Sequence, residues 1–281
     1  MILEGTENVK EITSNANKNY KLCVQLATRK YRDKYGLYLI EGSKLIEEAM
    51  LCNVEIKVLF LRENYESDYG AFGNTDGASA ADGIPAADGA SILEVSVLKK
   101  NLFDVIAQTE TSQGIIAIVE KRKYGAEEFF DKCNSGNILV LDRLQDPGNI
   151  GTLIRTADAA GYKGVICLKG TGDVFSPKVV RAAAGSLFRM PILFVDTAEE
   201  VLELVKSRGK KIVSTCFDAD VDYFDVDLKT NIALLIGNEG QGLSERLITG
   251  ADVKVKIPMS PSVDSLNAAV AGGILMYESL R

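Results

Sequence analysis

Three segments of the sequence combine polar residues with glycine or proline, and each directly follows a run of aliphatic residues. They span residues 142–162, 237–247 and 258–280. In a sheet of parallel strands, ligands bind beyond the carboxyl ends of the strands. Because all three segments begin where an expected strand ends, they form the candidate site of this chain.

The first of these segments has the pattern of an amphipathic helix. Its apolar residues follow the spacing i, i+3, i+4, i+7 and are Ile150, Leu153, Ile154 and Ala157. Gly161 is placed to end the helix, and Asn149 stands at its start, where a capping or loop residue belongs. Arg155 projects away from the apolar face. An exposed helical arginine is usually only solvated, so Arg155 by itself indicates no chemistry.

The second segment carries glycines at positions 237, 240 and 242, before a helix expected to start near Leu243. Glycine allows the backbone to approach a ligand closely. The order is G-x-x-G-x-G, whereas dinucleotide-binding sheets use G-x-G-x-x-G followed by an acidic residue about 20 positions later. The pattern therefore disfavours a nicotinamide-dependent oxidoreductase, and taken alone it is equally typical of a tight turn.

The third segment contains two prolines ahead of an expected terminal helix. Ser265 and Asn267 stand near the first turn of that helix, where such residues are common. Helix capping accounts for Ser262, Asp264 and Ser265 taken singly. It does not account for three unusual segments that all follow strands.

The composition restricts the chemistry that these segments can perform. The chain has 281 residues, enough for two domains, and it contains no histidine, which excludes any mechanism built on imidazole. Its five cysteines are scattered without a C-x-x-C pair, so we expect free thiols in a reducing cytoplasm and no metal site. No apolar run is longer than a strand, and the first residues lack a signal-peptide pattern, so we expect no membrane segment.

Charge is distributed unevenly along the chain. Residues 63–91 contain six acidic residues and no Lys or Arg, with Asp-Gly repeated at 76, 82 and 88, which predicts a flexible insert. Without the insert, the formal charge of −7 becomes −7 + 6 = −1. Residues 1–35 carry seven basic and four acidic residues. This basic stretch is consistent with a solvated helix surface and equally with RNA contact.

Hydrophobic patterning predicts two α/β domains. In residues 1–120, helical stretches (18–32, 43–51 and 99–106) alternate with strand-like stretches (37–40, 56–61, 92–97 and 114–119). The charged segment 121–136 is the expected linker. Residues 137–281 contain strands of the buried type, which predict a mostly parallel sheet. These strands are expected at 138–141, 164–168, 211–215, 232–236 and 253–257.

The three segments resemble the three motifs of the SpoU/TrmH RNA methyltransferases. The matching residues are N-I-G-T-L-I-R (149–155), I-G-N-E-G-Q-G-L-S (236–244) and I-P-M-S-P-S-V-D-S-L-N-A-A-V-A (257–271). Residues 176–189 are also similar to that family. Residues 39–49 and 111–117 resemble its N-terminal substrate-binding domain, which is similar to a ribosomal protein. The insert 63–91 matches no pattern of the family.

The resemblance implies a fold, a cofactor and an assembly. The C-terminal domain is expected to be a mostly parallel α/β sheet tied in a trefoil knot, to bind S-adenosylmethionine in a bent shape, and to form a homodimer. Topology rules alone would discard a knot, so this expectation comes from the family. The residues implied for cofactor binding are Gly237, Asn238, Glu239, Gly242, Ile257, Met259 and Leu266.

The resemblance also implies methylation of a ribose 2′-hydroxyl in structured RNA. Its catalytic set corresponds to Asn149, Arg155, Glu239, Ser265 and Asn267. Arginine stays protonated in proteins, so we expect Arg155 to clamp the RNA and stabilise charge, with solvent or an RNA phosphate as the proton acceptor. Ribosomal RNA is favoured over transfer RNA as the substrate. The open alternatives are a knotted relative that modifies a base nitrogen and a non-catalytic RNA-binding protein.

Overall fold

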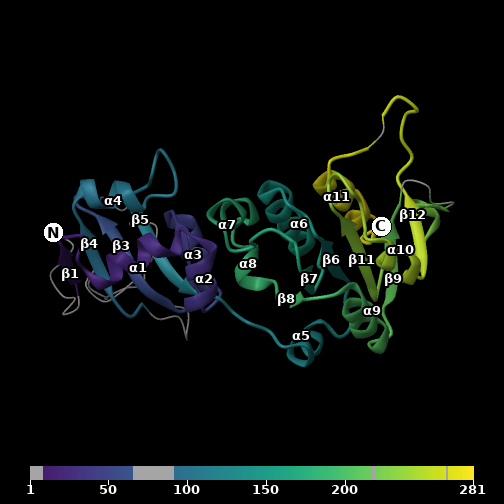
Figure 1. Cartoon of the computed structure of the whole chain (residues 1–281), viewed down its shortest axis with the longest axis horizontal. Coiled ribbons are helices and arrows are strands. Elements are labelled where there is room, and N and C mark those ends of the chain that lie inside the picture. Colours follow the sequence, from purple (N-terminus) through teal and green to yellow (C-terminus); the bar gives the residue numbers. More distant parts are fainter. Residues whose placement is uncertain (1–8, 66–91, 217–218, 220, 264) are drawn as a thin grey trace, which may run out of the picture. The chain divides into compact units, whose positions relative to one another are not determined.

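The protein divides into two compact units. The structure is a computed structural model, described for residues 9–65, 92–216, 219, 221–263 and 265–281. One unit comprises residues 1–121 together with 175–177, and the other comprises residues 122–174 and 178–281. Most of the insert predicted over 63–91 lies outside the described residues. Each unit has its own sheet and its own core, so each is described separately (Figure 1).

The first unit contains a mixed five-stranded sheet of order β1-β4-β3-β5-β2. β4 pairs in parallel with β1 and β3, whereas β5 is antiparallel to both β3 and β2. The strands are β1 (Val9–Ile12), β2 (Leu37–Glu41), β3 (Ile56–Arg62), β4 (Val95–Leu98) and β5 (Ile115–Glu120). The helices are α1 (Lys18–Leu26), α2 (Arg29–Tyr35), α3 (Ser43–Leu51) and α4 (Lys100–Ile106). Phe60 and Phe103 are fully buried in the core of this unit.

The helix predicted over residues 18–32 is in fact two helices. Asn17 caps α1, where its side chain accepts hydrogen bonds from the backbone N–H groups of Asn19 and Tyr20. Thr28 has an extended backbone with φ −106° and ψ 143°, which interrupts the helical hydrogen bonding before α2. Gly36 ends α2 in the left-handed conformation, φ 65°. The break gives α2 a direction of its own, independent of α1.

The second unit contains a seven-stranded sheet of order β10-β12-β9-β11-β6-β7-β8. Within the described ranges, every strand pair of this sheet is parallel, which confirms the predicted mostly parallel α/β fold. The strands are β6 (Ile138–Asp142), β7 (Gly164–Leu168), β8 (Ile192–Val195), β9 (Lys211–Thr215), β10 (Val221–Asp222), β11 (Ile232–Gly237) and β12 (Val253–Lys256). Their long aliphatic runs are typical of parallel strands that are covered on both faces.

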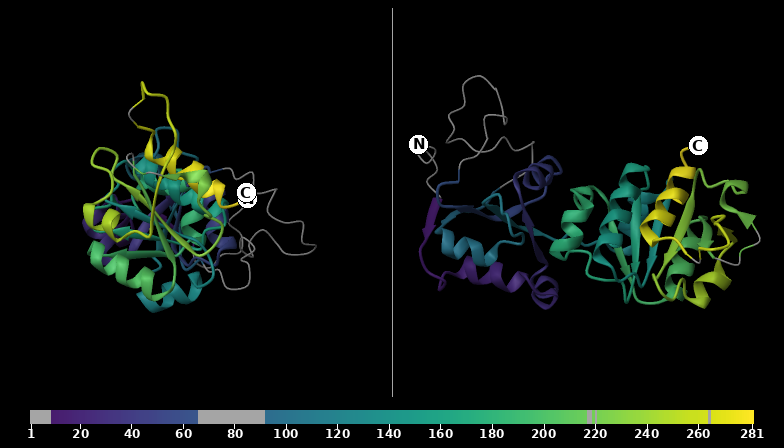
Figure 2. Two further views of the ribbon diagram at one scale, coloured as in Figure 1. Left: turned by 90° about the vertical axis from the view of Figure 1, so that its right-hand side faces the viewer. Right: turned by 90° about the horizontal axis from the view of Figure 1, so that it is seen from above.

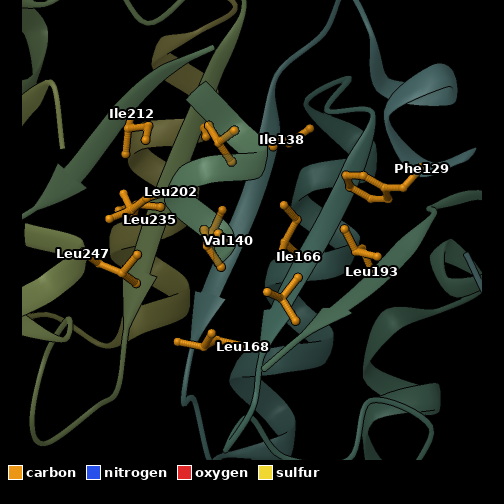
Figure 3. Packing of buried hydrophobic residues seen from close by; sticks show 14 of the residues in the cluster. Phe129, Ile138, Val140, Ile166, Leu168, Leu193, Leu202, Ile212, Leu235 and Leu247 are labelled. Atoms are coloured by element: carbon orange, nitrogen blue, oxygen red, sulfur yellow. The ribbon is translucent and has the colours of Figure 1, made fainter. Parts of the chain in front are cut away.

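Helices cover both faces of this parallel sheet. On one face, Phe129 and Leu202 pack against Val140 and Ile166 (Figure 3). On the other face, α11 packs against α6 (Figure 2, with α11 in yellow). A Cβ on Gly272 would lie 2.3 Å from Leu153 Cδ2, so glycine permits this close helix contact. The helices are α5 (Ala126–Cys133), α6 (Pro147–Ala159), α7 (Pro177–Ala183), α8 (Ser186–Arg189), α9 (Ala198–Ser207), α10 (Glu245–Gly250) and α11 (Ala268–Glu278), with a 3-10 turn η2 (Tyr223–Asp225).

The segment expected to link the domains, residues 121–136, contains helix α5. Phe129, Phe130 and Cys133 are buried in the core of the second unit. These three residues lie on one face of a short helix whose remaining residues are mostly charged. Most of the segment therefore belongs to the second unit, and its charged composition reflects the solvated face of α5.

The strand order decides which of the three chemical segments start side by side. β6 and β11 are neighbours, with Gly237 opposite Asp142, so the first two segments leave adjacent strands. β12 is separated from β11 by β9. The third segment therefore starts farther along the sheet than the first two. It has to return past two strands before α11 packs against α6.

Candidate active site

Asp142 anchors the point where the first two segments leave the sheet. Its side chain is fully buried at the end of β6. One carboxylate oxygen accepts a hydrogen bond from Arg143 Nε at 2.8 Å, and the other accepts from the backbone N–H of Ser244 at 2.6 Å. A buried carboxylate without hydrogen-bond partners would be costly, and these two bonds satisfy both oxygens. Asp142 thereby fixes the end of the glycine loop to the end of β6.

Arg143 makes further connections between the same two loops. Its guanidinium contacts Gln241 Oε1 at 3.4 Å, and its backbone carbonyl accepts from Asn238 Nδ2 at 2.8 Å. The hydrogen bond that Arg143 donates to the Asp142 carboxylate raises the pKa of the Arg143 guanidinium. Arg143 adopts φ +57°, a conformation that costs energy for a residue with a side chain. We interpret this strain as compensated by the hydrogen bonds on both sides of the residue.

The glycine loop, residues 237–242, forms a tight turn. The backbones of Asn238 and Gly242 pair with each other, at 3.1 and 2.9 Å. A Cβ on Gly237 would lie 2.3 Å from the carbonyl carbon of Gly242 and from the Leu243 nitrogen. No side chain fits there, because the nearest atoms belong to the backbone. Asn238 Oδ1 accepts from the N–H groups of Gly240 and Gln241, which stiffens the turn from within.

Glu239 extends from the glycine loop to the start of α6. Its carboxylate accepts from the N–H groups of Gln145 at 3.2 Å and Asp146 at 3.1 Å, and from Asn149 Nδ2 at 3.1 Å. Partial burial raises the pKa of Glu239. The hydrogen bonds from its own N–H, the Asn149 amide and these backbone N–H groups lower the pKa by a larger amount. The net pKa is below the usual value, so the group is ionised at neutral pH.

Asn149 joins the first motif to the third. Asp146 caps α6 by accepting from the Asn149 N–H at 2.9 Å, and Pro147 occupies the first turn. The Asn149 side chain is nine-tenths buried. Its amide nitrogen donates to Glu239, and its oxygen accepts from Asn267 Nδ2 at 2.9 Å. One amide therefore connects residues that are 90 and 118 positions away in the sequence.

Asn267 serves both as a helix cap and as a site residue. Its Oδ1 accepts from the N–H groups of Ala269 and Val270 at the start of α11. Its amide nitrogen is then free to point at Asn149. The cap thus sets the position of Asn267 and, through it, the place where the third segment ends against α6.

Arg155 and Ser265, two residues of the predicted catalytic set, lie outside this hydrogen-bond network. Both are exposed, and within the part of the chain that the structure describes neither side chain forms a hydrogen bond or an ion pair with another residue. Arg155 stands on the same helix as Asn149, and Ser265 lies two residues before Asn267. The network therefore joins Asn149, Glu239 and Asn267, and leaves the Arg155 guanidinium open to a ligand.

Three residues expected to line an adenine site are accessible. Ile257 and Met259 are half-buried and Leu266 is exposed, all on the stretch between β12 and α11. Accessible apolar side chains on a loop suit the face of a flat heterocycle. The residues present are thus compatible with a nucleoside cofactor.

Reading the sequence missed Asp142, Arg143, Gln145 and Asp146. A charged residue directly after four aliphatic residues was the available signal for Asp142. The hydrogen bonds to Ser244 and Gln241 depend on the neighbouring position of β6 and β11, which no local pattern encodes.

Two further properties of the described residues bear on function. No group of three or more His, Cys, Asp or Glu side chains there could hold a metal ion. None of the helices found there has the length and apolar character needed to cross a membrane.

The profile of the SpoU rRNA Methylase family matches residues 136–277 of this chain. The profile of the MRM3-like substrate binding domain matches residues 17–117. Together the two matches cover both units. They agree with the resemblance seen in the motifs.

Individual relatives are similar over nearly the whole chain. The 23S rRNA (guanosine(2553)-2′-O)-methyltransferase of Bacillus subtilis is 33% identical, over 96% of this chain and 98% of its own. The AdoMet-bound rRNA methyltransferase from Sinorhizobium meliloti superposes with a TM-score of 0.80 at 32% identity, covering 96% of this chain and 97% of its own. The SpoU methyltransferase AviRb from Streptomyces viridochromogenes, in complex with AdoMet, gives 0.79 at 30% identity, covering 94% and 97%.

Proposed function

The chain belongs to the SpoU rRNA Methylase family and is an S-adenosylmethionine-dependent RNA 2′-O-ribose methyltransferase, and we propose that its substrate is ribosomal RNA. The family, the enzyme class and the cofactor predicted from the motifs are confirmed by the comparisons. One structural observation supports the assignment of this activity to the site described above. The three motifs meet through a single side chain, Asn149, which binds Glu239 and Asn267 at once.

The glycine loop and the segment before α11 are the proposed cofactor site. Main-chain groups of Gly237, Ile257 and Leu266 hold S-adenosylmethionine, with Asn238, Gly242 and Met259 completing the site. The cofactor supplies a methyl group activated by a sulfonium centre. Glu239 keeps the glycine loop against α6 through its bonds to Gln145 and Asp146, so the loop presents one fixed shape to the cofactor.

Arg155 is the proposed electrostatic group. Its guanidinium is exposed on α6 and carries a permanent charge. Methyl transfer requires negative charge to develop on the ribose 2′-oxygen, and a fixed cation beside that oxygen stabilises this charge. Arg155 also grips the adjacent phosphate, while the proton leaves to solvent or to that phosphate. Asn149, Ser265 and Asn267 position the ribose.

The enzyme is proposed to act as a homodimer through the outer side of α11. Val270 and Tyr277 on α11, seven positions apart on the same side of the helix, are exposed at 52% each, and Leu280, just beyond its end, is exposed at 59%. Exposed apolar side chains along one side of a helix that already packs against α6 are typical of a subunit interface. The second subunit would then lie close to the helix that carries Arg155. Sedimentation of the purified protein, compared with a Tyr277→Glu variant, tests this assembly.

The trefoil knot is part of the same proposal. A knot requires the chain to thread through a loop, and the segment between β12 and α11, which passes β9 and β11 to reach α6, is the proposed threading segment. The fold shared with the solved relatives supports it. A cytoplasmic location follows from a ribosomal RNA substrate.

Two measurements test the proposed function. Purified protein with methyl-labelled S-adenosylmethionine should label ribosomal RNA and leave transfer RNA unlabelled. Mapping of ribose methylation in total RNA, from cells with and without the gene, should show one 2′-O-methyl site lost from ribosomal RNA. Labelling of transfer RNA alone would contradict the substrate, and labelling of a base would contradict the ribose.

A further inference from the structure

Helix α2 in the first unit concentrates positive charge on its surface. Its sequence, Arg-Lys-Tyr-Arg-Asp-Lys-Tyr, holds four basic residues and one acidic residue. Arg32 is buried and donates to the Leu26 carbonyl at 2.6 Å. Asp33 is already bound by Arg29 at 3.5 Å and Lys121 at 2.8 Å. Lys30 and Lys34 are both exposed, and neither is ion-paired within the described ranges.

Two tyrosines one helical turn apart lie beside these lysines. The rings of Tyr31 and Tyr35 are nearly parallel, with an interplanar angle of 11° and centroids 6.1 Å apart. Tyr35 is 41% exposed. Lys30 Nζ lies 5.9 Å from the centroid of Tyr31, and Lys34 Nζ lies 5.1 Å from that of Tyr35. The helix therefore presents two aligned aromatic rings, each with a cation beside it.

Given the proposed function, we infer that α2 binds unpaired nucleotides of the substrate RNA: Tyr35 and Tyr31 stack on bases, and Lys30 and Lys34 contact the flanking phosphates. Every base has a flat π face, so stacking on aromatic rings tolerates any sequence. Proteins use this combination of rings and cations for single-stranded loops and bulges, because the bases of a duplex are already stacked on each other.

The chain provides a matched control surface within the same unit. Lys99 and Lys100, at the start of α4, are also two adjacent exposed lysines. Lys100 is paired with Asp104 at 2.6 Å, and among the described contacts no aromatic ring accompanies either lysine. If charge alone attracted RNA, loss of either lysine pair would weaken binding, with the α4 pair contributing less to the extent that Asp104 offsets Lys100. If the two tyrosine rings contribute to binding, replacing the lysines of α2 should weaken RNA binding strongly, and replacing the lysines of α4 should not.

The experiment measures binding directly, independently of methylation. Fluorescence anisotropy of the full-length protein compares a hairpin RNA with an unpaired loop and a fully paired duplex of similar length. We expect Tyr31→Ala/Tyr35→Ala to weaken hairpin binding by more than about tenfold and duplex binding by less than about threefold. Lys30→Ala/Lys34→Ala should weaken both RNAs and lower the salt dependence by about two counterions. Lys99→Ala/Lys100→Ala should stay within about threefold of wild type.

A second pair of variants guards against misfolding, because Tyr31 is partly buried. Tyr35→Leu keeps the bulk but loses the ring and should weaken hairpin binding, whereas Tyr35→Phe keeps the ring and should bind like wild type. Unchanged hairpin affinity in the double alanine variant would overturn the inference, and so would equal losses in both lysine pairs. A wild-type protein that binds the hairpin through α2 but methylates no RNA would overturn the proposed function and leave this inference standing.

Discussion

The second unit holds Asn149, Glu239 and Asn267 in a network of hydrogen bonds, whereas the first unit exposes charged and aromatic side chains on α2. In the second unit, Asp142 is fully buried and Asn149 is nine-tenths buried, and each bonds to residues from a different motif. In the first unit, Lys30, Lys34 and Tyr35 face solvent. The two sheets differ as well. The sheet of the second unit is parallel and covered by helices on both faces, whereas the sheet of the first unit is mixed.

This difference separates two physical tasks. Methyl transfer depends on holding the reacting atoms in line, so the groups around them must be fixed by neighbours. Gripping RNA depends on charge and stacking, which tolerate side-chain motion. The comparison teaches that substitutions in the second unit should reduce kcat, and substitutions on α2 should raise KM. The predictions below test that division, beginning with the largest effect.

Replacement of Arg155 by alanine is expected to cause the largest loss. The Arg155 side chain is exposed and lies outside the hydrogen-bond network of the second unit, so the change breaks no described side-chain hydrogen bond and should leave folding intact. Loss of a preorganised cation at the developing oxyanion should reduce kcat by roughly 10²–10³-fold, with affinity for S-adenosylmethionine within about twofold of wild type. Single-turnover methylation and calorimetric titration of the cofactor measure the two quantities.

A matched arginine controls for the loss of charge. Arg246 is exposed in the same unit, two residues beyond the second motif, and its side chain pairs with Glu199 of α9 at 3.1 Å. Arg246→Ala should retain near wild-type kcat. Equal activity of Arg155→Ala and wild type would remove Arg155 from the mechanism. A rise in KM without a fall in kcat would mean that Arg155 contributes to RNA binding. That result would contradict the division of tasks between the two units.

Glu239→Gln is expected to have the next largest effect, reducing kcat/KM by roughly tenfold to 100-fold. The variant keeps the shape of the side chain but replaces one acceptor oxygen by an NH₂ group, which cannot accept a hydrogen bond. Either the Gln145 N–H, or the Asp146 N–H and the Asn149 amide, then lose their acceptor. Affinity for S-adenosylmethionine should fall as well, because the glycine loop loses its attachment to α6. Glu245→Gln, an exposed neighbour on α10, is the control and should be unaffected.

The same variant makes a prediction about pH. The folded pKa of Glu239 lies below its ordinary value, so ionised Glu239 favours the folded state. That contribution is fully present above the unfolded pKa, about 4.3, and is lost as the pH falls through the lower folded value. The difference in melting temperature between wild type and Glu239→Gln should be constant from pH 6 to 8 and should shrink below about pH 4. A difference that grew on acidification would contradict this assignment.

Much of the site could be predicted from sequence because its parts are local. The helix stripe of α6 and the glycine turn at 237–242 depend on neighbouring residues and lie where the pattern placed them. The cap of α11 is also local, but it is Asn267, whereas the sequence offered Ser262, Asp264 and Ser265 for capping. The hydrogen bonds that join these parts could not be predicted. They depend on β6 lying beside β11, and on the third segment returning past β9 to meet Asn149.

The sequence predictions were least accurate where a single sequence pattern covered two structural features. The charged stretch before residue 136 concealed the buried face of α5, because a short helix shows only three apolar residues. The stretch 18–32 looked like one helix, although an extended Thr28 divides it. That division matters for function, since it leaves Tyr31 and Tyr35 on a helix with its own direction. The sequence predicted a basic stretch, and only the structure shows which of its side chains share one exposed surface.

The smallest effect is expected from replacing residues 66–91 with a Gly-Ser linker of about eight residues. The described ends are held by β3 and β4, which pair in parallel from Leu59–Val95 to Arg62–Leu98. Loop closure depends weakly on length, so shortening the connection roughly threefold changes stability by only about 1 kcal/mol. Removing acidic residues near an RNA-binding unit should raise RNA affinity at low salt, by less than about threefold once salt screens the charges. Differential scanning calorimetry and anisotropy measure both. A large fall in melting temperature would mean that the first unit, like the second, depends on contacts that its sequence does not reveal.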